Sequence, residues 1–231
     1  AVAINNSYAA MPQHGVSQAD ILYEMLIEGE TRCMGVFYNF SAATQPLGSI
    51  RSARRDFIRV AMAYDAIFVH KGFSPRQGSK YDAYSAEVTF EETGWDHLDG
   101  NVGGIAKEYF YETRLNYGAE HRTFTTPAGI MAYAEKKGCT LTRENSLDVG
   151  LKFDEEAFFV GESAKKLQIW FNMSQSTSEK WHKYTTMTYN EETGLYEAQQ
   201  KHSGYSDVNA YVDGNTDEVL SFRNVLVLRT H

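Results

Sequence analysis

The fold is decided by residues 52–70, which read SARRDFIRVAMAYDAIFVH. Apolar side chains recur in this stretch at three- and four-residue spacing and predict an amphipathic helix: Phe57, Ile58, Ala61 and Met62. Ser52 is its expected N-cap, because a serine hydroxyl can accept a hydrogen bond from the first turn. Residues 66–70 follow at once as a buried strand. With an earlier strand at 31–38, this order predicts a βαβ unit over residues 31–70.

The chain on either side of this unit is predicted to be mixed α and β. Two apolar runs at 21–28 and 31–38 flank Gly29 and favour a β-hairpin, although a helix capped by Ser17 over the first run is the alternative. A helix is expected over 127–137, because Thr126 stands at its N-cap and Gly138 follows its last turn. Residues 74–104 are rich in glycine and are expected to form a long irregular stretch.

After residue 150 the pattern changes to short alternating strands. These are expected at 166–173, 182–189, 195–200 and 222–228, with a hairpin turn at 190–194. The predicted fold class is therefore α+β. A mixed α/β domain over residues 1–150 contains the βαβ unit and precedes a smaller antiparallel β domain over residues 151–231. Both ends of the chain are apolar runs, so we expect the second domain to be incomplete.

Composition excludes several classes of function. The 231 residues hold 22 Lys and Arg against 30 Asp and Glu, a net charge of −8, with no basic block, which argues against a nucleic-acid partner. No apolar run approaches the roughly 20 residues that cross a bilayer. Cys33 and Cys139 have no metal-ligand spacing, so we expect no metal, and Cys33 is expected to be a buried free thiol. Nucleotide-binding motifs are absent, and no cofactor is expected.

The strongest candidate for chemistry is GSIRSARRDF at residues 48–57. Arg51 and Arg54 bracket Ser52 where the helix is expected to begin. A helix N-terminus favours an anion, and arginine binds carboxylate or phosphate with two parallel hydrogen bonds. The alternative is that both arginines pair with carboxylates of the hairpin, for which Glu24, Glu28 and Glu30 are available.

Two further features are less specific. Glu24 and Glu28 lie about 13 Å apart along one strand face, which is too far for an acid–base pair, so an ion-paired or solvated acidic row is expected. His70 ends a buried strand, where ligands of α/β sheets tend to lie, although a core histidine is the alternative. His121 is a second histidine of this kind.

Five stretches together resemble the YerB-like lipoproteins, a bacterial family. They are INN at 4–6, MPQHGVSQADILYE at 11–24, EGETR at 28–32, GSIRSAR at 48–54 and YDAIFVH at 64–70, with weaker likeness at 189–196 and 224–227. The resemblance implies an anchor on the outer face of the cell membrane and two domains of unknown function, without an assigned reaction. The loop at 76–93 departs from the family pattern, and the family's second domain continues past the last strand here.

These observations predict an extracytoplasmic, lipid-anchored binding protein, whose only link to the membrane is an anchor outside this chain. Its ligand would be an anionic small molecule or a cell-wall component. The pocket is expected near Arg51, Ser52, Arg54 and His70, edged by Glu24, Thr31 and Arg32. One alternative is an envelope hydrolase with His70 or Glu24 as general base, and another is a scaffold for a protein partner.

Overall fold

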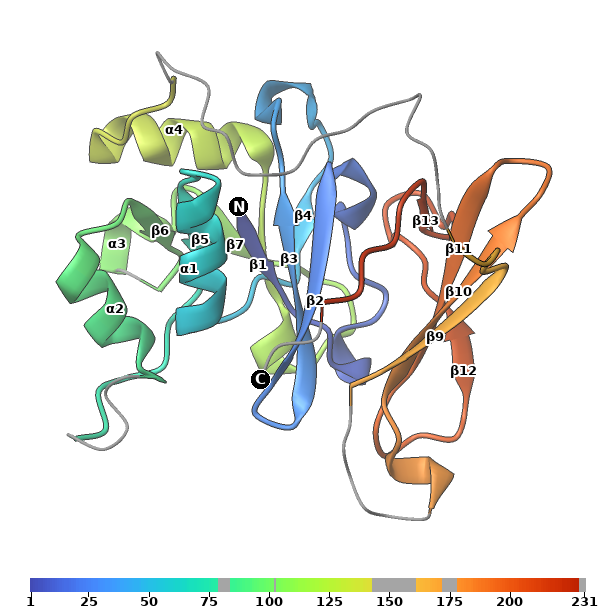
Figure 1. The fold of residues 1–231 in the computed structure, drawn as a ribbon. Helices are drawn as coiled ribbons and strands as arrows, with labels where there is room; N and C mark the ends of the chain where they lie inside the picture. Colours follow the sequence, from blue (N-terminus) through green and yellow to red (C-terminus); the bar gives the residue numbers. More distant parts are fainter. Residues whose placement is uncertain (79–83, 102, 143–160, 172–177, 229–231) are drawn as a thin grey trace.

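A computed structural model describes residues 1–78, 84–101, 103–142, 161–171 and 178–228 (Figure 1). The expected domain boundary at residue 150 lies outside these residues. Three sheets organise the described residues. We call them the N-terminal sheet, with strand order β2-β3-β1-β5-β6, the small sheet, with order β4-β8-β7, and the C-terminal sheet, with order β12-β11-β10-β9 and β13 paired to β11. The predicted α+β class is confirmed.

The N-terminal sheet begins as the sequence predicts. Strands β2 (Ile21–Ile27) and β3 (Glu30–Val36) form an antiparallel hairpin. Its turn places Glu28 and Gly29 at φ 56° and 85°, a region that glycine enters without a Cβ clash. The hairpin is confirmed, and β3 then pairs antiparallel with β1 (Val2–Ile4).

The parallel part of this sheet lies elsewhere than expected. Strand β1 runs parallel to β5 (Phe68–His70), and β5 runs parallel to β6 (His97–Asp99). Because β3 is antiparallel to β1, it is also antiparallel to β5, so residues 31–70 are not a βαβ unit. The βαβ unit of this protein is β5, α2 (Ala86–Thr93) and β6. The sequence pattern alone predicts the order of helices and strands along the chain, but it does not predict whether neighbouring strands run parallel or antiparallel.

Helix α1 (Arg55–Ala63) buries Phe57, Ile58 and Ala61 against the N-terminal sheet, as its spacing predicts. Its N-cap, however, is Arg54 rather than Ser52. The reason is a backbone ladder. The N–H of Ala53 donates to Gly72 O, and the N–H of Lys71 donates to Arg51 O, which holds residues 51–53 extended. The prediction of Ser52 as the cap is wrong because tertiary pairing delays the helix.

The prediction of an irregular stretch over residues 74–104 is wrong for the part of it that the structure describes. They contain α2, β6 and the start of α3 (Gly103–Ala106). Ser85 Oγ accepts a hydrogen bond from the N–H of Val88 and caps α2, and Gly94 ends it at φ 60°. Helix α4 (Pro127–Lys137) is confirmed with its predicted caps, since Thr126 Oγ1 accepts from the N–H of Gly129.

The remaining strands build the other two sheets. The small sheet holds β4 (Leu47–Gly48), β7 (Phe110–Glu112) and β8 (Thr123–Thr125). The C-terminal sheet holds β9 (Lys166–Trp170), β10 (Tyr184–Asn190), β11 (Leu195–Lys201), β12 (Val208–Ala210) and β13 (Ser221–Phe222). Short 3₁₀ helices lie at Tyr8–Ala10, Val16–Gln18, Phe40–Ala42, Ala119–His121 and Glu179–Trp181.

The hairpin turn at 190–194 is confirmed by the full pairing of β10 with β11. The strand expected over 222–228 is wrong beyond its first residue, because β13 ends at Phe222 and residues 223–228 follow without strand assignment. Residues 172 and 173 of the expected 166–173 strand lie outside the described residues.

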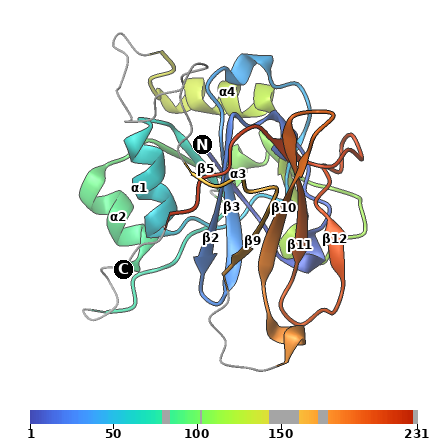
Figure 2. The same ribbon diagram turned by 45° about the vertical axis from the view of Figure 1, so that its right-hand side comes forward.

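The C-terminal sheet packs beside the β2–β3 hairpin in both views (Figures 1 and 2). Ala198, Tyr211 and Leu220 share one apolar core with residues of β1 and β3. Asp213 adds a polar attachment, since its carboxylate accepts hydrogen bonds from the backbone N–H groups of Gly15 and Ser17. Among the described residues, no helix is long and apolar enough to cross a membrane. The packing leaves a cleft between the sheets.

Candidate functional site

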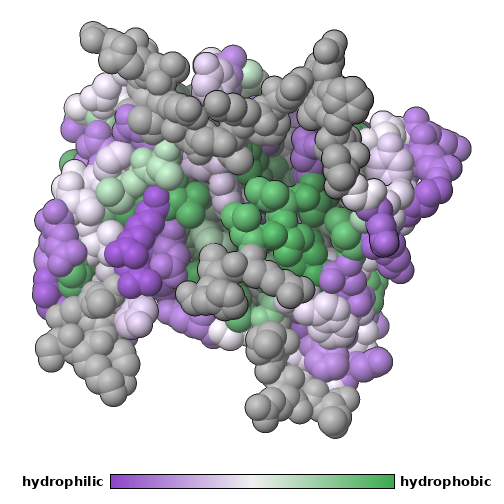
Figure 3. All heavy atoms as spheres, viewed as in Figure 1, coloured by the Kyte–Doolittle hydropathy of each residue, from purple (hydrophilic) through white to green (hydrophobic). Residues whose placement is uncertain are grey.

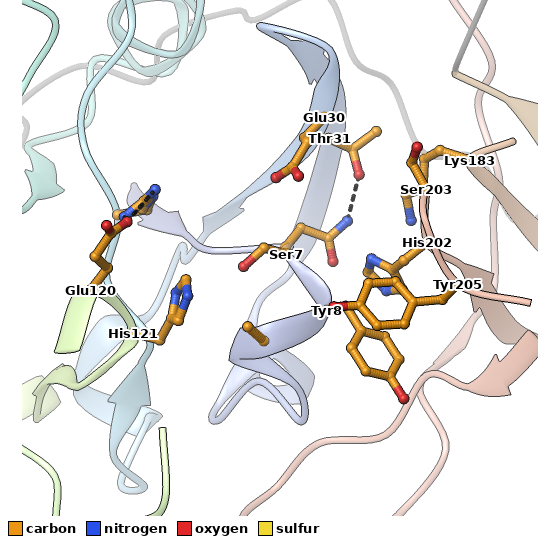
Figure 4. A pocket seen from close by; sticks show the side chains of 13 residues that line it. Ser7, Tyr8, Glu30, Thr31, Glu120, His121, Lys183, His202, Ser203 and Tyr205 are labelled. Atoms are coloured by element: carbon orange, nitrogen blue, oxygen red, sulfur yellow. Dashed lines mark hydrogen bonds and ion pairs between the residues drawn. The ribbon is translucent and has the colours of Figure 1, made fainter. Parts of the chain in front are cut away.

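The cleft lies where the N-terminal sheet meets the C-terminal sheet, and its volume is about 340 Å³. Thirteen described residues line it, and of these only Ala9 lacks a polar atom in its side chain. Figure 4 shows Glu120 and His121 on one side, Lys183, His202 and Tyr205 on the other, and Thr31 between them. The size falls within the range of about 300–1,000 Å³ typical of small-molecule sites, but such sites are usually lined mainly by apolar groups.

The floor of the cleft is a buried polar network that joins the two sheets. Asn6 Nδ2 donates to Glu24 Oε1 at 2.9 Å and to Thr31 Oγ1 at 2.8 Å, and Thr31 Oγ1 donates to Glu24 Oε1 at 2.8 Å. From the C-terminal sheet, Thr185 Oγ1 donates to Glu24 Oε2 at 2.7 Å. Glu24 is therefore held by donors from both sheets and cannot rotate without breaking several bonds.

The Lys183 ammonium group sits on this floor. Its Nζ is 3.1 Å from Glu24 Oε1, and its side chain is only 2% exposed. The contact compensates the charge, but the ammonium group has no hydrogen-bond acceptor in good geometry among the described residues. Ser7 Oγ, which also lines the cleft, is likewise buried without a partner there. In native proteins, buried polar atoms of this kind are usually satisfied by a water molecule, an ion or a ligand.

His121 presents a defined hydrogen-bond donor. Asn5 Oδ1 accepts from the N–H of Ser7 at 3.1 Å, which fixes the amide so that Asn5 Nδ2 donates to His121 Nδ1 at 2.7 Å. The neutral ring must then carry its proton on Nε2. Burial, with the nearby Arg51 cation, lowers the pKa of His121 and keeps the ring neutral. This ring donates and cannot act as a base through Nε2.

Arg51 brings a second cation to the cleft. Its Nη1 and Nη2 atoms are both 3.4 Å from Glu120 Oε2, on a carboxylate that is largely exposed. Long, exposed ion pairs of this kind contribute little. The guanidinium group is therefore available to a ligand.

The second histidine that lines the cleft, His202, is also neutral. Burial, with the nearby Lys183 and Lys201 cations, lowers the pKa of His202 to about 3. Lys201 lies behind it, with Nζ donating to the carbonyls of Lys180, His182 and Tyr205. The positive charge near the cleft is thus fixed over the neutral pH range and does not depend on histidine protonation.

The rim of the cleft is aromatic. Tyr8 and Tyr205 are stacked with ring centroids 3.7 Å apart and an interplanar angle of 20°. They remain 37% and 41% exposed, and both line the cleft. Each ring supports the other, so the pair offers a rigid aromatic surface to whatever enters.

The structure divides the predicted site residues into two groups. Arg51 and Thr31 line the cleft, and Glu24 lies directly beneath it. The others do not line it, because Arg54 forks onto Glu28 with contacts of 2.7 and 2.8 Å and Arg32 contacts the same carboxylate at 3.1 Å. Accordingly, hydrogen bonding to Arg54 lowers the pKa of Glu28. The ion-pair interpretation holds for Arg54, whereas the carbonyl of Ser52 accepts a hydrogen bond from Arg32 Nη1.

His70 lies outside the cleft and is fully buried. Its Nδ1 donates to Gly72 O at 2.8 Å, so its Nε2 accepts a hydrogen bond from His97 Nδ1 at 2.8 Å. Both ring nitrogens are occupied, and Phe68 and Phe90 stack on the ring. This is the core histidine that the sequence left open as the alternative. His70 therefore has no free ring nitrogen for the general-base role, whereas Glu24 is held by three hydrogen bonds and its role as a general base stays a prediction.

Sequence reasoning missed the cleft residues that directly precede β10 and follow β11: Lys183, His202, Ser203 and Tyr205. It also missed Asn6, although this residue belongs to the quoted INN stretch. The one signal in the sequence that could have indicated Asn6 is its position as a polar residue after an apolar strand. The described residues contain no cluster of acidic, cysteine or histidine side chains able to hold a metal ion.

A separate apolar surface is visible on the face shown in Figure 3. Exposed large apolar side chains include Leu26 on β2 and, near the end of the described chain, Leu226 and Leu228 at 71% and 70% exposure. None of these residues lines the cleft. A scaffold role for a protein partner stays a prediction.

Fold and cleft define an α+β protein with a polar cleft between a mixed sheet and an antiparallel sheet. The family model "Protein of unknown function (DUF3048) N-terminal domain" matches residues 1–140, and the chain belongs to this family. It is 33% identical over 147 residues to "Putative lipoprotein YerB" of Bacillus subtilis (strain 168), which covers 63% of this chain and 40% of that relative. The resemblance to YerB-like lipoproteins is confirmed.

A solved structure has the same fold. The crystal structure of YerB protein from Bacillus subtilis matches with a TM-score of 0.68 at 23% identity, over 95% of this chain and 64% of that chain. The chain therefore spans less than two thirds of the length of either relative. This likeness concerns the fold alone.

Proposed function

We propose that this protein is an extracytoplasmic, lipid-anchored binding protein whose cleft takes an anionic ligand of the cell envelope. The observation that carries the proposal is the Lys183 ammonium group, which lines the cleft, is ion-paired with Glu24 Oε1 at 3.1 Å, and has no hydrogen-bond acceptor in good geometry among the described residues. A buried ammonium group gains strongly from an anionic acceptor, because charge-assisted hydrogen bonds are about twice as strong as neutral ones.

Arg51 supports the same ligand chemistry from the opposite side of the floor. Its ion pair with Glu120 is long and exposed, so a ligand anion can replace it at small cost. His121 adds a neutral N–H donor directed by Asn5. The site differs from the one expected at the start of α1, because Arg54 is occupied by Glu28.

Calorimetry with a minimal anionic probe, glycerol 3-phosphate, and with purified cell-wall fragments tests this proposal. Arg51→Gln should weaken binding about tenfold or more, because one charge-assisted hydrogen bond is worth about 1.5–3 kcal/mol. Arg54→Gln is the matched control. It removes the same charge and also breaks an exposed pair with a glutamate, but outside the cleft, so its affinity should equal that of the unaltered protein. Equal losses in the two variants, or no binding of any anionic probe, would refute the proposal.

The cellular location has its own test. The name of the curated relative supports an anchor on the outer face of the cell membrane. Cells that make the native protein should carry it in the membrane fraction, accessible to protease added outside. Recovery in the cytoplasmic fraction, protected from that protease, would contradict this part of the proposal.

A further inference from the structure

The chemistry of the cleft specifies more than negative charge. Its lining contains carboxylates as well as cations, with Glu30 and Glu120 set against Arg51 and Lys183. Carboxylates only accept hydrogen bonds, and the cations only donate them. A simple anion would use the donors and be repelled by the acceptors. A ligand that satisfies both must carry groups that donate and accept, and hydroxyl groups do both.

The aromatic rim supplies the large apolar surface among the described lining residues. Tyr8 and Tyr205 stack on each other and keep more than a third of their surface exposed. His202 supports Tyr8 edge-on, with ring centroids 5.8 Å apart at 71°. Such a platform fits a flat ligand face made of C–H groups. Sugar rings combine that kind of face with a circumference of hydroxyl groups.

We propose that the cleft binds an anionic sugar, a ring bearing hydroxyl groups and one phosphate or carboxylate; this inference rests on the proposed function. The ring stacks on the Tyr8–Tyr205 pair, and the anionic group reaches Lys183 and Arg51. Ring hydroxyls donate to Glu30 and accept from His121 Nε2 and from the otherwise unpaired Ser7 Oγ. Ser7 Oγ, which has no hydrogen-bond partner among the described residues, thereby gains one.

Three small probes separate the two parts of the ligand. N-acetylglucosamine 6-phosphate carries ring and anion, N-acetylglucosamine carries the ring alone, and glycerol 3-phosphate carries the anion alone. Calorimetry should show the sugar phosphate binding at least about tenfold more tightly than either half. N-acetylmuramic acid, which carries a carboxylate on a lactyl ether at O3 and no phosphate at O6, then distinguishes a phosphate-bearing glycan from a carboxylate-bearing wall sugar as the source.

Variants at the rim test the stacking directly. Tyr205→Leu should weaken binding of the sugar phosphate about five- to tenfold while leaving glycerol 3-phosphate unchanged, as expected for loss of one aromatic contact. Tyr205→Phe keeps the ring and should bind like the unaltered protein, which also guards against misfolding of the leucine variant. Tyr189→Leu is the matched control, since Tyr189 has the same exposure as Tyr8 but lies at the far end of β10, beside Tyr196.

The outcomes separate this inference from the proposed function. If glycerol 3-phosphate binds as tightly as the sugar phosphate and depends on Arg51, the sugar inference is overturned and anion binding stands. If neither anionic probe binds, both are overturned. If N-acetylglucosamine binds as tightly as N-acetylglucosamine 6-phosphate, and independently of Arg51, the inference that the ligand carries an anionic group is overturned. Loss of sugar binding in Tyr205→Phe as large as in Tyr205→Leu also overturns the stacking model.

Discussion

Removing one member of the Glu24–Lys183 pair should destabilise the protein, and the two single substitutions should differ in cost. The pair joins β2 to the start of β10 across the cleft floor, with 3.1 Å between Oε1 and Nζ and side chains 13% and 2% exposed. At that separation the attraction is about 5 kcal/mol for an effective dielectric constant of ~20. Desolvation of both charges offsets much of it, so the pair itself contributes little net stability.

The two single substitutions should differ in cost because the Glu24 carboxylate accepts hydrogen bonds that the Lys183 ammonium group lacks. Glu24→Gln leaves the Lys183 ammonium buried without a counter-charge, which should cost about 4 kcal/mol. Lys183→Met leaves the Glu24 carboxylate still accepting hydrogen bonds from Asn6, Thr31 and Thr185, so its cost should be nearer 2.5 kcal/mol. The double variant removes both charges and should cost about 3 kcal/mol, well short of the sum of the singles.

Urea unfolding measures these differences. Tryptophan fluorescence reports on both parts of the chain, because Trp95 lies beside the N-terminal sheet whereas Trp170 and Trp181 belong to the C-terminal part. Circular dichroism should give the same midpoint if the two sheets unfold together. The reasoning would be refuted if the free-energy cost of the double variant equalled the sum of the two single costs. It would also be refuted if Lys183→Met cost more than Glu24→Gln, because the hydrogen bonds are expected to stabilise the Glu24 carboxylate and not the Lys183 ammonium group.

Three further outcomes follow from the geometry. Gly15→Ala should cost at least about 2 kcal/mol in urea unfolding, because φ is +78° and a Cβ would lie 2.5 Å from Pro46 O; an unchanged midpoint would contradict this. Burial opposes ionisation of Asp213, but the hydrogen bonds that its carboxylate accepts, led by the one from Ser17, lower its pKa. The stability of the folded protein should therefore fall as the pH drops below about 4. The Asp213→Asn variant should lose this pH dependence. Burial and the nearby His70 lower the pKa of His97 to about 4. Because the unfolded chain takes up this proton near pH 6.5, the folded state should keep its full stability above about pH 6.5 and lose part of it between there and pH 4. A titration midpoint of His97 near 6.5 by NMR would refute this prediction.

The elements predicted correctly are those whose signals are local. Helix α4 has Thr126 and Gly138 at its ends, and the β2–β3 hairpin turns at Gly29, so neighbouring residues suffice to define them. Helix α2 was missed although Ser85 and Gly94 mark its ends in the same way, because surrounding glycines suggested a loop. The N-terminus of α1 was misplaced because the ladder between residues 51–53 and 71–74 overrides the helix preference of Ser52.

The direction of β3 relative to β5 could not be derived from pattern. A strand–helix–strand order is compatible with either direction until the neighbours in the sheet are known. Here β1 inserts between β3 and β5 and pairs parallel with only one of them. Local propensity describes each element, whereas sheet order depends on which apolar faces pack together.

The cleft was predictable only in part, for a related reason. Arg51, Thr31 and Glu24 were candidates because their charge or position stands out locally, whereas Lys183 stands in a run of polar strand residues where a lysine is expected to be exposed. It is buried because the C-terminal sheet packs over the hairpin and brings it to Glu24. The residues beyond the family model, Lys183, His202 and Tyr205, form one wall of the cleft, and residues 1–140 form the other. The cleft therefore belongs to both sheets together, and residues 1–140 contribute Arg51 and His121 to a cleft that they do not complete.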